Sequence, residues 1–131
     1  MSTLIIVKPN WTENEVFLSE LSNLIEKHGL CIIFSKKIHM SRDFWMEFYI
    51  QHTGSSYFSE LIQWMSSSPS LFLVVDGPDA LSLVRWQIIG RNGLGLRGKH
   101  QISELMNVAH ASDSEKSAAR EITLLYSSLS V

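Results

Sequence analysis

The side chain with the clearest chemical potential is His110, in the stretch NVAHASDS from Asn107 to Ser114. It stands between an apolar run and a cluster of helix-starting residues. An imidazole beside a helix N-terminus meets a partial positive charge, which disfavours the protonated ring and attracts anions. Because a neutral imidazole is a nucleophile, a phosphoryl group could be transferred onto it there. The alternative is a strand end followed by a helix cap, since most histidines have structural or solvent-exposed roles.

A second candidate is the segment 85–100, RWQIIGRNGLGLRGKH, which contains four glycines and no acidic residue although the whole chain is slightly acidic. Guanidinium groups and exposed backbone N–H groups suit a loop that wraps phosphates. A solvated basic loop is the alternative. The cations of this segment are Arg85, Arg91, Arg97 and Lys99.

Other catalytic patterns are weaker. Gly93, Gly95 and Gly98 form G-x-G-x-x-G, but they follow a predicted helix, whereas a dinucleotide fingerprint follows a strand and opens a long helix. Ser112 and Asp113 adjoin His110 too closely for a hydrolase triad, which gathers distant residues. The five histidines show no i,i+4 pairing and no cysteine partners, so we expect no protein metal site.

The elements that would position these residues follow from hydrophobic periodicity and from caps. TLIIVKP predicts a strand that Pro9 ends, with Lys8 at its carboxyl end, and Gly29 predicts the stop of a helix over 15–28. Ser41 predicts a helix cap, and Ser112 with Glu115 has the spacing of a capping box. The remaining predicted strands cover 30–40, 70–77 and 106–110, and the remaining predicted helical pieces cover 41–52, 57–65, 78–90, 102–105 and 112–126.

This order of strands and helices suits split βαβ units. It predicts an α/β (α+β) fold in which helices pack on a four-stranded, largely antiparallel, ferredoxin-like sheet. At 131 residues we expect a single domain over 1–131.

Composition narrows the functional class. Hydrophobic residues at 45% and charged residues at 18% are typical of a globular domain. The net charge of −2 gives no overall attraction to nucleic acid or to an anionic membrane. No apolar run approaches the roughly 20 residues that span a bilayer, so we expect no membrane association. The single cysteine, Cys31, lies among apolar neighbours, which predicts a buried thiol and favours a cytoplasmic location.

Taken together, LIIVKP near the start, NVAHASDS and the following SAAREI resemble the nucleoside diphosphate kinase family, almost from end to end. The resemblance implies the same ferredoxin-like fold. It implies that a histidine takes the γ-phosphate of a nucleoside triphosphate and passes it to a nucleoside diphosphate. This ping-pong cycle needs Mg²⁺, which is bound through the nucleotide phosphates.

The resemblance also implies roles for individual residues. His110 matches the phosphorylated nucleophile, Ser112 and Glu121 the pair that holds it, and Tyr49 the tyrosine beside it. The nucleotide-contacting positions divide by the part of the nucleotide they meet. Lys8 and Asn107 match the positions that contact the sugar, and Lys8 is also close to the transferred phosphate. Arg85 and Arg97 match the positions that contact the phosphates. Tyr57 matches the aromatic residue, usually phenylalanine, on which the base stacks. Stacking on Tyr57 tolerates any base.

The chain departs from the family between Gly90 and Arg97, where it is about half a dozen residues shorter than usual, a large change for a functional loop. A phosphate-binding threonine has no clear match there, and Asn92 is the nearest candidate. The resemblance implies a homo-oligomer, a hexamer or a tetramer built from dimers. The shortened loop weakens that expectation, because the loop contributes to subunit contacts.

The leading hypothesis is a nucleoside diphosphate kinase. One rival is a catalytically weak or inactive module of the same fold that binds nucleotides or proteins. A nucleic-acid-binding regulator, based on the segment 85–100 and Tyr57, is a third possibility, which the net charge disfavours.

Overall fold

The computed structural model describes residues 1–90, 94–100 and 107–129. Its strands are β1 (Ser2–Val7), β2 (Cys31–Ile38), β3 (Ser70–Asp76) and β4 (Ala109–Ala111). Its helices are α1 (Glu15–Lys27), α2 (Arg42–Phe48), α3 (Phe58–Ser67), α4 (Ala80–Leu83), α5 (Gly95–His100) and α6 (Glu115–Leu129), with a 3₁₀ turn at Ile50–His52 and a π-helical turn at Val84–Ile88. The predicted helical turn at 102–105 and the candidate Asn92 lie outside the described residues.

The four strands form one sheet in the order β2-β3-β1-β4, and every neighbouring pair is antiparallel. This arrangement confirms the predicted ferredoxin-like sheet. The central strand β1 pairs Ile5 with Leu73 on one side and Ile6 with His110 on the other. The β1–β4 pairing therefore fixes the position of the candidate nucleophile.

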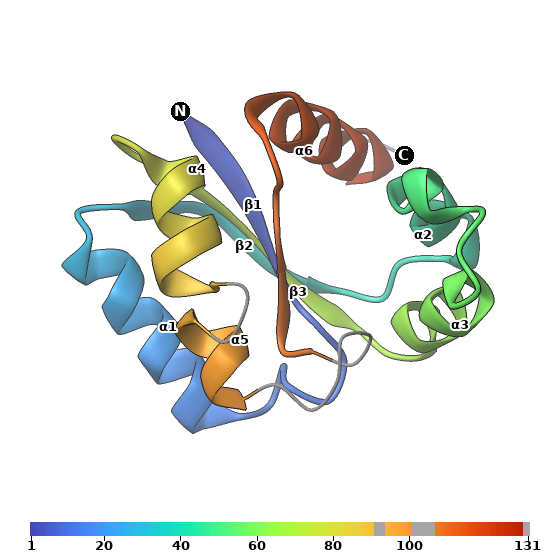
Figure 1. Ribbon diagram of the computed structural model, residues 1–131, viewed down its shortest axis with the longest axis horizontal. Coiled ribbons are helices and arrows are strands. Elements are labelled where there is room, and N and C mark those ends of the chain that lie inside the picture. Colours follow the sequence, from blue (N-terminus) through green and yellow to red (C-terminus); the bar gives the residue numbers. More distant parts are fainter. Residues whose placement is uncertain (91–93, 101–106, 130–131) are drawn as a thin grey trace.

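Helices cover both faces of the sheet, with α1, α4 and α5 on one side and α2, α3 and α6 on the other (Figure 1). Side chains of β1 alternate between the two faces, so its continuous apolar run supplies both cores. Ile5 and Val7 belong to the core beneath α1, whereas Leu4 and Ile6 belong to the core beneath α2, α3 and α6. The fully buried ring of Trp45 lies in the second core.

Local chemistry explains the ends of several elements. Asn14 accepts a hydrogen bond from Phe17 N–H at the start of α1, and Gly29 follows its end at φ +75°. The predicted stop at Gly29 is therefore confirmed. Ser41 accepts from Phe44 N–H, which confirms the predicted cap of α2.

Gly90 and Gly95 meet at the base of the shortened loop. A Cβ at Gly90 would lie 2.0 Å from the carbonyl oxygen of Leu94, and one at Gly95 would lie 2.7 Å from that of Ile89. Both glycines also have positive φ. Only residues without a side chain allow the backbone to close here. Arg97 N–H then donates to Ile89 O at 2.8 Å, which holds α5 against the preceding turn.

Two sequence predictions are wrong, and a third, which the structure confirms as helical, is refined. Ser112 does not cap the last helix: Ser114 does, accepting from Ser117 N–H at 3.1 Å, and α6 begins at Glu115. Cys31 is exposed rather than buried, because β2 is an edge strand whose residues are mostly exposed. The predicted helix over 78–90 contains the π-helical turn, in which Ile89 N–H donates to Val84 O.

Among the helices of the described ranges, none has the length and apolar character needed to cross a bilayer.

Candidate active site

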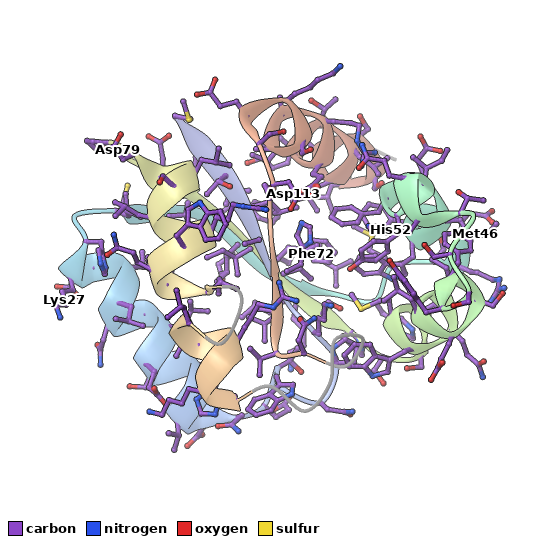
Figure 2. The ribbon with its side chains drawn as sticks, viewed as in Figure 1. Lys27, Met46, His52, Phe72, Asp79 and Asp113 are labelled. Carbon is purple, nitrogen blue, oxygen red and sulfur yellow. The ribbon has the colours of Figure 1, made fainter. Side chains whose placement is uncertain are left out.

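A pocket of about 580 Å³ opens between the end of β4, the residues after α2 and the helix α5. Figure 2 shows His52 on the side of α2 and Asp113 beside the end of β4. Both of these residues line the pocket. The pocket brings together most of the residues that the sequence singled out. They are Lys8, Tyr49, Tyr57, Arg97, Asn107, His110 and Glu121.

His110 lies on β4, and its side chain is 17% exposed, so it can be reached from the pocket. Nε2 of the ring lies 2.9 Å from Oε1 of Glu121. Phe48 and Tyr49 pack edge-on against the imidazole, with ring centroids at 5.1 and 6.4 Å. If Nε2–H donates to the carboxylate, Nδ1 carries the lone pair. In that tautomer Nδ1 is the ring nitrogen available to act as a nucleophile.

Glu121 organises this part of the site. Its Oε1 also accepts from Ser112 Oγ at 2.8 Å, and Ser112 Oγ accepts from Leu4 N–H at 3.3 Å. Burial alone would raise the pKa of Glu121, but the charge and hydrogen bond of His110, with smaller contributions from Ser112 and Arg120, lower it below its usual value. Glu121 is therefore an anion that orients the ring and can stabilise positive charge on it.

Lys8 and Arg97 are two of the three cations among the described residues that line this pocket. Lys8 is 6% exposed, and its backbone N–H donates to Val108 O at 3.0 Å, which holds it beside β4. Burial, followed by the positive charge of Arg97, lowers the pKa of Lys8 to about 7. Nζ lies 5.6 Å from the centre of the Trp64 ring. Two mutually repelling cations in a partly enclosed pocket favour an anionic ligand, because an anion relieves that repulsion.

Tyr49 presents a buried hydroxyl to the pocket. The residue is 7% exposed, and burial, followed by the charge of Glu121, raises its pKa far above the usual value. Within the described ranges no protein group hydrogen-bonds this hydroxyl. A buried hydroxyl normally has a partner, so a neutral donor in this position suits a polar ligand.

Arg85, the other arginine predicted to contact phosphate, is not among the residues that line the pocket. It forms an ion pair with Asp113, which does line it, and its guanidinium lies 5.0 Å from the Trp86 ring centre. Ser112 is fully buried behind Glu121 and likewise does not line the pocket.

Sequence reasoning did not single out several of the pocket residues, among them the polar side chains His52 and Arg120. His52 follows Tyr49 by one helical turn, and its Nδ1 lies 2.9 Å from the hydroxyl oxygen of Tyr57. Arg120 precedes Glu121 and donates to Phe48 O at 2.9 Å, which ties α6 to the end of α2. The sequence signal for His52 was its helical spacing from Tyr49, and the signal for Arg120 was its position next to Glu121.

Within 1–90, 94–100 and 107–129 no three histidine, cysteine or acidic side chains come together as a possible metal site. The charged lining is mixed, with Lys8, Arg97 and Arg120 set against Glu60, Asp113 and Glu121.

The family model described as nucleoside diphosphate kinase matches residues 1–131. The nucleoside diphosphate kinase of Saccharolobus islandicus is 33% identical over 130 residues, covering 95% of this chain and 93% of the relative. That of Staphylothermus marinus is 34% identical over 129 residues, covering 95% and 91%.

Solved structures agree. The Aquifex aeolicus nucleoside diphosphate kinase has a TM-score of 0.85 at 33% identity, covering 99% of this chain and 97% of that one. A halophilic nucleoside diphosphate kinase from Halobacterium salinarum, in complex with CDP, has a TM-score of 0.83 at 25% identity, covering 95% and 86%. Fold, site geometry and sequence thus lead to one conclusion: the chain belongs to the nucleoside diphosphate kinase family.

Proposed function

We propose that this protein transfers the γ-phosphate of a nucleoside triphosphate to a nucleoside diphosphate through a phosphohistidine at His110. The observation that carries the proposal is the His110–Glu121 contact of 2.9 Å in a pocket that also contains Lys8 and Arg97. One nucleophile, one orienting anion and two cations are what in-line phosphoryl transfer requires of a protein.

In the proposed transfer step the bond that forms at His110 replaces one that breaks in the nucleotide. The Nδ1 lone pair forms a bond to the γ-phosphorus while the bond between that phosphorus and the bridging oxygen breaks. The electron pair leaves with the nucleoside diphosphate. The Nε2 proton stays between the ring and Glu121, whose charge stabilises the positive charge that develops on the imidazole. The same steps in reverse, with a second nucleoside diphosphate, regenerate His110.

The pocket contains residues suited to contact the phosphates, the sugar and the base of a nucleotide. Lys8 and Arg97 meet the phosphates, and the Tyr49 hydroxyl can donate to a phosphate oxygen. Lys8 and Asn107 are the candidates for the sugar hydroxyls. Tyr57, 40% exposed at the rim of the pocket, provides a ring face for the base. The Halobacterium salinarum relative was solved with CDP, which supports a nucleotide as the ligand.

Mg²⁺ belongs to the proposal as a cation carried by the nucleotide phosphates. The mixed charges of the pocket fit this mode, because the lining offers cations for the phosphates together with the carboxylates of Glu60, Asp113 and Glu121, and the ion would be held chiefly by the nucleotide phosphates. When bound, the ion neutralises phosphate charge.

The non-catalytic module predicted as a rival receives no support from the comparisons, because the relatives named here are kinases. Homo-oligomer formation and a cytoplasmic location stay proposals. The first rests on the family resemblance and is measurable by light scattering. The second rests on the single cysteine, which has no cysteine partner in the chain.

The direct test is labelling with γ-labelled ATP. The folded protein should acquire label that is stable to base and labile to acid, as a phosphoramidate is, and added nucleoside diphosphate should remove it. Unlabelled protein, or label that nucleoside diphosphate does not remove, would contradict the proposal.

A change from Glu121 to glutamine should reduce phosphoryl transfer at least about a hundredfold. Glutamine keeps the shape but not the charge, and its amide can donate to Nε2. That contact places the ring proton on Nδ1 and removes the attacking lone pair. Steady-state transfer from ATP to a second nucleoside diphosphate measures the effect. Glu115→Gln, exposed at the start of the same helix, is the matched control. Wild-type turnover in Glu121→Gln would remove the role given to this carboxylate.

A further inference from the structure

His52 and Tyr57 form a pair at the rim of the pocket, and His52 has no role in the proposed transfer of phosphate. The Tyr57 hydroxyl oxygen lies 2.9 Å from His52 Nδ1, and the ring centroids are 5.9 Å apart. Both side chains line the pocket and both are exposed. The pair therefore closes the turn 53–56 at its two ends.

The pair is also connected to the rigid interior. The His52 ring centroid lies 6.1 Å from that of Tyr49, and the Tyr49 centroid lies 6.4 Å from that of His110. Tyr49 is buried in the core beneath α2, α3 and α6. His52 thus bridges a fixed buried ring and an exposed one.

The contact with His52 restricts a side chain that is otherwise weakly held at the start of α3. Tyr57 directly precedes α3, and its side chain makes no capping hydrogen bond to that helix. An exposed aromatic side chain that stacks on a ligand loses rotamer freedom, at a cost of about three- to tenfold in affinity. A hydrogen bond that already fixes the ring removes this cost before the ligand arrives.

We propose that His52 is a positioning residue that holds the Tyr57 ring, through its hydroxyl, as a preformed stacking face for the nucleotide base. The inference rests on the proposed function. A phenol can donate to a neutral imidazole nitrogen or accept from a protonated one, so the contact persists in either state of His52. Because the Tyr57 hydroxyl is bonded to His52, the ring turns its flat face, and not its polar edge, towards the base. A flat ring face can stack on bases of any kind.

A double-mutant cycle tests the proposal by calorimetric titration with two probes, ADP and inorganic tripolyphosphate. Tyr57→Phe and His52→Leu should each weaken ADP binding by about three- to tenfold, and the double variant should bind no more weakly than either. The affinity for tripolyphosphate, which has no base, should not change. His52→Asn, whose amide can occupy the position of Nδ1, should regain most of the ADP affinity.

Tyr126→Phe is the matched control, because Tyr126 is also 40% exposed and does not line the pocket. Additive losses in the double variant would overturn the proposal, since the two side chains would then act independently. Equal weakening of tripolyphosphate and ADP by His52→Leu would also overturn it, by making His52 a phosphate ligand. These measurements need no turnover, so a missing phosphohistidine in the wild-type protein would count against the proposed function alone.

Discussion

Replacing His110 with alanine should abolish phosphohistidine formation and lower nucleotide phosphate transfer by roughly 10⁴-fold or more. The imidazole is the only group proposed to bond to phosphorus, and Glu121, the nearest carboxylate, is held by Ser112 and His110 rather than aimed at a ligand. Loss of the His110 imidazole therefore removes the covalent route for phosphoryl transfer and leaves a protein that can only bind the nucleotide. Labelling with γ-labelled ATP and steady-state transfer to a second nucleoside diphosphate measure the two effects.

Two controls make this result specific. His39→Ala removes an exposed histidine that lies outside the pocket and contacts Ser66 O, and it should retain both label and turnover. ADP should still raise the thermal midpoint of His110→Ala, which shows that the pocket is intact. Label of undiminished amount on His110→Ala would identify another nucleophile and end the proposed mechanism.

Replacing Lys8 with methionine should change activity and stability in opposite directions. The variant loses a cation beside the transferred phosphate, so we expect transfer to fall by about a hundredfold. In the ligand-free protein the same side chain destabilises the folded state, because burial and the charge of Arg97 lower its pKa from 10.5 to about 7. A shift of this size corresponds to a penalty on the order of 4 kcal/mol near pH 7. Methionine, which is similar in length, should recover much of it.

The sign of the pH dependence follows from proton binding. Between pH 7 and pH 10 the unfolded chain keeps the Lys8 proton while the folded chain has lost it, so wild-type stability from this residue rises with pH across that window. The advantage of Lys8→Met should therefore be largest at or below pH 7 and should shrink towards pH 10. Chemical denaturation at both pH values measures it. Lys116→Met, exposed on α6, is the control. Equal stability of Lys8→Met and wild type at pH 7 would contradict the buried-charge argument.

Elements that depend on local periodicity could be predicted from the sequence. The apolar run of β1 identified a strand, and Gly29 identified the end of α1, because each pattern has one physical cause within a few residues. His110 could be singled out as a candidate because its neighbours carry the family pattern.

Features that depend on tertiary contacts could not be predicted in the same way. Ser112 and Ser114 both have the side chain of a helix cap. The family resemblance already linked Ser112 to Glu121, but only the fold shows that Ser112 also accepts from Leu4 N–H and does not cap α6. The exposure of Cys31 depends on where β2 lies in the sheet, which composition does not reveal. The ion pair of Arg85 with Asp113 likewise requires residues far apart in the chain to meet.

The close contact of Gly90 with Gly95 has a consequence for how this site can vary through mutation. Arg97 follows that contact by two residues, and its backbone N–H bonds to Ile89 O. A methyl group at either glycine would push apart the backbone that sets the guanidinium in place. Natural selection on nucleotide turnover should therefore constrain two positions that have no side chain and do not line the pocket, as strictly as it constrains the arginine itself.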